Sequence, residues 1–129
     1  MRYPIAIEPG NAQQAFGVCV PDLPGCFSAG DNLDQAIDNA REAIELWLET
    51  LIDGGGRIPE PRSIRSLAAE PEFAGWIWAV VDVDLAQLSD KVERVNITLP
   101  ARILRRIDAA AKAAGESRSG FIAHLALRA

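Results

Sequence analysis

Four aspartates early in the chain are the residues whose type and spacing come closest to a metal-dependent active site. Asp22, Asp31, Asp34 and Asp38 are close in sequence, and clustered carboxylates can hold two metal ions for phosphoryl transfer. However, Asp34 and Asp38 are one turn apart on the polar face of an expected amphipathic helix, where solvated carboxylates are usual. Asp22 and Asp31 fall in expected loops, where aspartate favours turns. We therefore expect no metal site here.

Three other features could support catalysis, phosphate binding or metal binding. His124, the only histidine, falls late in the final expected helix, without a serine, cysteine or carboxylate at a spacing that would activate it as a general base. The glycines at 54–56 follow a helix instead of linking a strand to a helix, so they indicate a helix end. Cys19 and Cys26 lack the further ligands of a zinc site. The sequence therefore predicts a protein that is not an enzyme and has no cofactor.

A third pattern, in the last third of the chain, is typical of DNA recognition. Residues 94–99 alternate strictly between polar and apolar types, so a strand here would carry its polar side chains on one face. That face consists of Arg94, Asn96 and Thr98. Arginine can pair with guanine and asparagine with adenine in the major groove, which a two-stranded ribbon fits. We therefore predict that these three side chains contact DNA bases.

Two helices are expected after this strand. Pro100 can begin the first, whose apolar stripe is bordered by basic residues, and Gly115 ends it. Ser117 is a good N-cap for the second helix. The free backbone N–H groups of a helix start can hold a phosphate and fix the register of a protein on DNA. The segment from Lys91 is therefore expected to be strand, helix, helix.

Such a short segment cannot fold alone. One strand and two short helices cannot bury their apolar faces, and the strand has no ladder partner inside the segment. A homodimer with antiparallel pairing of the two strands would bury the apolar faces and would give each strand a ladder partner. The alternative is a basic dimerisation arm that does not bind DNA. Whether dimers pair again into tetramers stays open.

Residues 1–84 carry a different pattern. Strands are expected at 3–8, 15–20, 25–28 and 76–83, and a strongly amphipathic helix runs from Leu33 to the glycines at 54–56. Asn32 would be the N-cap of this helix, with Gln35 as its capping-box partner. The order is β-β-β-α-β, so the fold class is α+β. Residues 85–90 are expected to be a short linker to a second domain at 91–129.

Charge supports the same division. Residues 1–90 hold 5 Lys or Arg against 15 Asp or Glu, whereas residues 91–129 hold 8 against 3. An acidic part and a basic part favour partners of opposite charge. The chain has 129 residues, 49% of them hydrophobic, and no apolar run approaches the roughly 18 residues of a membrane helix. We expect a cytoplasmic protein with no membrane partner.

Residues 92–127 resemble the ribbon-helix-helix family of bacterial transcription repressors. The ribbon is Val-Asn-Ile-Thr-Leu-Pro at 95–100, and the turn into the second helix is Gly-Glu-Ser-Arg-Ser at 115–119. The resemblance implies base contacts by Arg94, Asn96 and Thr98, and phosphate contacts by Ser117, Arg118 and Ser119. Gly120 departs from the family, which often has glutamate there to complete a capping box.

The first part resembles the HicB family of antitoxins. The motifs are Pro-Asp-Leu-Pro-Gly-Cys-Phe-Ser-Ala-Gly-Asp at 21–31, the helix residues Ala36, Asn39, Ala40, Glu42 and Ala43, and Ile-Pro-Glu-Pro at 58–61. The resemblance implies a partial RNase H-like fold without nuclease activity. It also implies a partner, a HicA toxin, which is a small basic mRNA interferase. An acidic domain would attract such a protein and compete with RNA for its basic surface.

These observations predict an antitoxin of a type II toxin–antitoxin system. Its first part would occlude a HicA-like mRNA interferase through residues that the sequence does not identify, and its dimeric β-ribbon would repress its own operon. Two alternatives stay open. One is an RNase H-like nuclease whose tail targets nucleic acid. The other is a repressor that senses a small ligand through Trp47, Trp76 and Trp78, which we otherwise expect in the core.

Overall fold

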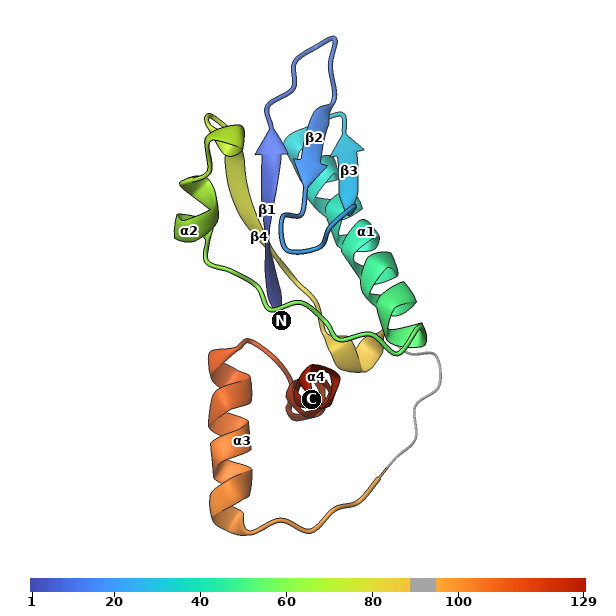
Figure 1. The fold of residues 1–129 in the computed structure, drawn as a ribbon, viewed down its shortest axis with the longest axis vertical. Coiled ribbons are helices and arrows are strands. Elements are labelled where there is room, and N and C mark those ends of the chain that lie inside the picture. The colour runs from blue at the N-terminus through green and yellow to red at the C-terminus, as the bar shows by residue number, and fades with distance from the viewer. Residues whose placement is uncertain (89–94) are drawn as a thin grey trace.

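The computed structural model describes residues 1–88 and 95–129. Its first part contains a 4-stranded antiparallel sheet with the order β3-β2-β1-β4 (Figure 1). The strands are β1 (Arg2–Glu8), β2 (Phe16–Cys19), β3 (Phe27–Gly30) and β4 (Ile77–Asp82). The expected β-β-β-α-β order is confirmed. The third strand, however, begins two residues later than its predicted start at residue 25.

One helix, α1 (Leu33–Asp53), packs on this sheet with its small and aliphatic residues inward. The buried residues are Ala36, Ala40, Ile44 and Leu48. Asn32 caps the helix as predicted, because its side chain accepts from the Gln35 amide at 2.8 Å. The predicted capping box is shifted by one residue, since the Gln35 side chain accepts from the Asp31 amide and not from that of Asn32.

The central strand β1 is buried from Tyr3 to Ile7. The chain that follows α1 turns back onto the sheet near it, where the Tyr3 hydroxyl donates to the Pro59 carbonyl at 2.8 Å and Ile58 is buried in the same core. Burial raises the pKa of Tyr3. A short helix, α2 (Ile64–Ala68), and a 3₁₀ helix, η1 (Pro71–Phe73), then lead into β4; neither was predicted.

The last part of the chain contains α3 (Ala101–Ala113) and α4 (Arg118–Arg128), as expected. Gly115 lies between them with a φ of 69°, a conformation that favours glycine. Ahead of them, η2 (Leu85–Gln87) contacts α4, and Leu85 is buried. The predicted linker at 85–90 therefore begins with an ordered 3₁₀ helix; residues 89 and 90 lie outside the described ranges.

Residues 95–100 form no strand within the single chain. A strand needs a neighbour for its backbone N–H and C=O groups, and the described part of the chain offers none to this segment. The observation agrees with a strand that pairs only in a dimer. The predicted ribbon at 94–99 stays a prediction.

Candidate functional site

The predicted base-contacting residues lie in the exposed segment that precedes α3. Asn96 and Thr98 are both exposed, whereas Arg94 lies outside the described residues. The apolar residues between them are exposed as well: Val95 retains 70% and Ile97 63% of its accessible surface. Large apolar side chains at this exposure in alternate positions are typical of a surface that another chain covers.

The predicted phosphate site lies at the other end of α3 (Figure 1). Ser117 caps α4, because its hydroxyl accepts from the Gly120 amide at 3.0 Å. The cap therefore forms without the glutamate that ribbon-helix-helix proteins often carry at this position. Thirteen residues of helix separate the two predicted contact regions, about 20 Å at 1.5 Å per residue. One copy of the chain thus does not bring them into a single site.

Two carboxylates lie beside this helix start. Arg118 pairs with Asp108, with Nε–Oδ1 and Nη2–Oδ2 distances of 2.7 and 2.8 Å. This hydrogen bonding lowers the pKa of the Asp108 carboxyl and raises that of Arg118. The Asp84 carboxylate approaches Gly120 so closely that a Cβ there would lie 2.6 Å from Oδ1. A side chain at position 120 would require the Asp84 carboxylate to move, which is one structural reason for glycine here.

The outer surface of α3 is basic. Four cationic side chains of the helix are exposed: Arg102, Arg105, Arg106 and Lys112. Because they follow the exposed segment at 95–100, the described tail combines polar donors with positive charge, as nucleic-acid-binding surfaces do.

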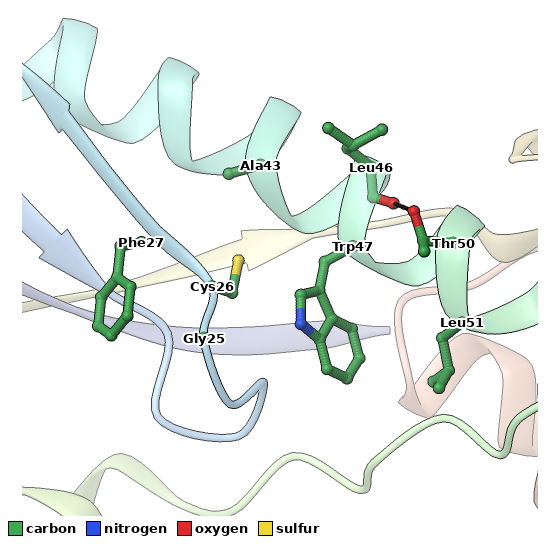
Figure 2. A pocket seen from close by; sticks show the side chains of 8 residues that line it. All are labelled: Gly25, Cys26, Phe27, Ala43, Leu46, Trp47, Thr50 and Leu51. Carbon is green, nitrogen blue, oxygen red and sulfur yellow. Dashed lines mark hydrogen bonds between the residues drawn. The ribbon is translucent and has the colours of Figure 1, made fainter.

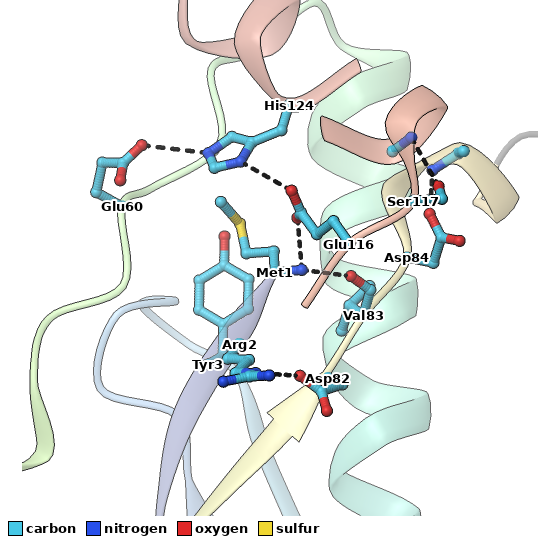
Figure 3. A network of polar contacts seen from close by, with 12 residues as sticks. Met1, Arg2, Tyr3, Glu60, Asp82, Val83, Asp84, Glu116, Ser117 and His124 are labelled. Carbon is cyan, nitrogen blue, oxygen red and sulfur yellow. Dashed lines mark hydrogen bonds and ion pairs between the residues drawn. The ribbon is translucent and has the colours of Figure 1, made fainter. Parts of the chain in front are cut away.

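A cluster of polar contacts, buried at His124 and Glu116 and exposed at Glu60 and Arg128, joins the α4 region to the first part of the protein (Figure 3). His124 is buried, with Nε2 at 3.3 Å from Glu60 and Nδ1 at 3.5 Å from Glu116. Glu116 also pairs with the Met1 ammonium group at 2.5 Å, and Arg128 pairs with Glu60 at the same distance. The sequence predicts no general-base role for His124, and the structure places it in a packing position. Its carboxylate partners were not predicted, because they come from distant segments.

The four aspartates do not form one site. Asp22 is buried and accepts from Arg62 twice, from Nε at 2.7 Å and from the backbone amide at 3.0 Å. The hydrogen bond to Asp22 raises the pKa of Arg62. Asp31, Asp34 and Asp38 are exposed. Among the residues that the structure describes, no group of three or more His, Cys, Asp or Glu side chains could hold a metal ion.

We predict that Asp22→Asn lowers the free energy of unfolding by about 1–3 kcal/mol, because it weakens two hydrogen bonds to a buried carboxylate. Urea denaturation at neutral pH measures this difference. Asp38→Asn, which makes the same change at an exposed position, is expected to stay within about 0.5 kcal/mol of the wild type. Equal stability of the two variants would contradict a structural role for Asp22.

The structure also bears on the cysteines and on the prediction that no helix crosses a membrane. Cys19 and Cys26 are free thiols, and burial raises the pKa of Cys26 to about 11. Cys26 is therefore a buried, protonated thiol at neutral pH. No helix in residues 1–88 or 95–129 is long and apolar enough to cross a membrane.

Comparison with known proteins assigns the chain to a family. The family model described as the HicB-like antitoxin of bacterial toxin–antitoxin systems matches residues 3–126. The chain belongs to this antitoxin family. The HicB family is one of non-enzymatic regulators, so the expectation that this protein is not an enzyme is confirmed, and the nuclease alternative is wrong.

Individual relatives extend over most of the chain. The crystal structure of the Burkholderia pseudomallei antitoxin HicB covers 98% of this chain and 96% of its own, with 44% identity and a TM-score of 0.80. A 14.9 kDa protein from the rep-hol intergenic region of Haemophilus phage HP1 is 44% identical over 128 residues, 98% of this chain and 95% of its own. A chain of the HicA3 and HicB3 toxin–antitoxin complex is 31% identical, with a TM-score of 0.56, over 65% of this chain and 99% of its own.

Proposed function

We propose that this HicB-family antitoxin binds a HicA-like mRNA interferase through its acidic first part and occludes the active site of the toxin. Family membership over residues 3–126 carries the proposal. The relative in the HicA3 and HicB3 complex supports a toxin as partner. Charge gives the physical reason, because 15 acidic residues against 5 basic ones in residues 1–90 attract a basic RNA-cleaving protein.

This proposal includes an assignment of each part of the chain to a known fold. We assign residues 1–84 to a partial RNase H-like domain and residues 91–129 to a ribbon-helix-helix domain. The 4-stranded antiparallel sheet with α1 is compatible with the first, and the two helices joined at Gly115 with the second. Both partners, toxin and operator DNA, would be met in the cytoplasm.

The second task is repression of the operon that encodes the protein. Two copies would pair residues 94–99 into a β-ribbon and insert it into the major groove, where Arg94, Asn96 and Thr98 contact bases. The exposure of Asn96 and Thr98 and the basic surface of α3 support this assignment. The exposed apolar residues at 95 and 97 support the dimer, because they would form its shared core.

Phosphate contacts by Ser117, Arg118 and Ser119 would flank the ribbon. All three residues are exposed, and the α4 N-terminus offers backbone N–H groups to an anion. Arg118 pairs with Asp108 in the free protein, so a phosphate must compete with that carboxylate. The ion pair also holds the guanidinium group beside the helix start.

We predict that Asn96→Ala weakens operator binding and relaxes sequence preference, because each good bidentate base contact contributes about 1–3 kcal/mol of discrimination. Titration of labelled operator DNA and of a scrambled duplex at fixed salt measures both. Gln13→Ala, an exposed amide in the first part, is the control and should bind like the wild type. Unchanged affinity and preference in Asn96→Ala would show that the ribbon assignment is wrong.

A further inference from the structure

An apolar groove lies between the start of β3 and the second half of α1 (Figure 2). Its volume is about 430 Å³, and its walls include Cys26 and Phe27 on one side and Leu46, Trp47 and Leu51 on the other. The groove is open to solvent, and it shares no lining residue with the cluster of polar contacts at α4. It is larger than a second hollow beside Met1 and His124, whose volume is about 200 Å³.

The groove collects the most exposed apolar side chains of residues 1–88. Phe27 retains 68% and Leu46 66% of its accessible surface, and they stand on opposite walls. A single exposed apolar residue is ordinary, whereas two large ones that line the same hollow mark an interaction surface. A partner surface that enters the groove would cover both.

The walls of the groove are formed before any partner binds. The indole Nε1 of Trp47 donates to the Pro24 carbonyl at 3.0 Å, which ties the loop before β3 to α1. Gly25 has a φ of 81°, and the Cys26 amide donates to the Leu23 carbonyl at 3.0 Å, so the loop has its own turn. Because the loop and the helix are already ordered, binding here needs little further ordering of the backbone, which limits that part of the entropy cost.

The helix wall carries negative charge. Residues 33–53 contain six acidic residues and one basic residue. Glu42 and Glu49 lie four residues before and three residues after Leu46, so they share its side of the helix. Arg41 lies five residues before Leu46 and therefore on a different face. The groove thus combines an apolar floor with an acidic rim.

From this combination we infer that the groove binds the toxin, through an apolar side chain that projects from the toxin's basic RNA-binding surface. The inference rests on the proposed function. An RNA-cleaving protein needs a basic surface to hold phosphates, which complements the acidic rim. The same rim repels nucleic acid and the acidic first part of a second copy of this chain. Occupation of the groove would therefore block RNA binding directly.

The test uses the full chain with Phe27→Ala and Leu46→Ala combined. Its partner is the product of the open reading frame adjacent to the one that encodes the chain. We expect Kd to rise at least about tenfold, mainly through faster dissociation, because buried anchor residues dominate interface energetics. Both residues are exposed, so the melting temperature should stay close to that of the wild type. Val80→Ala, at an exposed apolar position on β4, is the matched control and should leave Kd unchanged.

The outcomes separate the groove from the function. If the unmodified protein binds the toxin and the double variant binds it with the same Kd, the groove assignment is wrong. The proposed antitoxin function is not affected by that result. No binding by the unmodified protein contradicts the proposed function itself. A change of oligomeric state in the double variant, measured by sedimentation without toxin, would assign the groove to a second copy and overturn the inference.

Discussion

Ile97→Glu is expected to leave the protein monomeric and to abolish specific operator binding while toxin neutralisation persists. In the single chain this side chain is 63% exposed, so a glutamate there does not disturb the fold. In the proposed ribbon the same position enters the shared core, once from each copy. Burial of an unpaired carboxylate costs several kcal/mol, and the dimer would bury two of them, so dimer formation is strongly opposed.

The expected loss in operator affinity is large. Specific binding exceeds non-specific binding by about 10³-fold or more, and that difference requires both half-sites. Analytical ultracentrifugation measures the oligomeric state, and titration of operator DNA measures the affinity. Gln14→Glu, an exposed position in the first part, adds the same charge and controls for repulsion of DNA. A dimeric Ile97→Glu protein that binds the operator would contradict the ribbon.

The second large effect concerns toxin capture. Glu42→Lys combined with Glu49→Lys is expected to slow association with the toxin by about 10- to 10³-fold at low salt, because the acidic side of α1 steers a basic partner. The difference from the wild type should shrink as salt rises, since exposed charges are screened. Stopped-flow mixing at several salt concentrations measures both effects.

A charge-matched control makes this test specific. Glu8→Lys with Glu72→Lys changes the net charge equally at exposed positions outside α1. We expect this control to slow association with the toxin less than Glu42→Lys with Glu49→Lys does. Equal loss in the two double variants would assign the effect to net charge and contradict a special role for the α1 side of the molecule.

Local signals in the sequence were sufficient to predict α1 and the two C-terminal helices. The apolar periodicity of α1, the Asn32 cap and the glycines at 54–56 all act within one element, so they can be recognised without a fold. The same holds for Gly115 and Ser117, which form the turn between α3 and α4. The short helix α2 was missed because five residues give too little periodicity.

The partners of the buried polar side chains could not be predicted, because they come from distant parts of the chain. Asp22 meets Arg62 across 40 residues, and His124 meets Glu60 across 64. Sequence spacing carries no signal for such pairs. Asp22 consequently looked like one of four similar loop or helix aspartates, although only it is buried among them.

The groove was hidden in the sequence for a related reason. Trp47 falls on the apolar side of α1 and was expected in the core. It does pack against the core, and its indole N–H donates to the Pro24 carbonyl, but it also lines an open hollow. Phe27 and Leu46 become neighbours across this hollow only when β3 packs against α1.

The central claim is that this protein neutralises an RNA-cleaving toxin by binding it. The most direct measurement mixes the purified full chain with the product of the adjacent small open reading frame, and follows complex formation together with cleavage of a test RNA. We predict a tight complex and complete protection of the RNA at equimolar antitoxin. Absence of a complex, or RNA cleavage by this protein alone, would contradict the account.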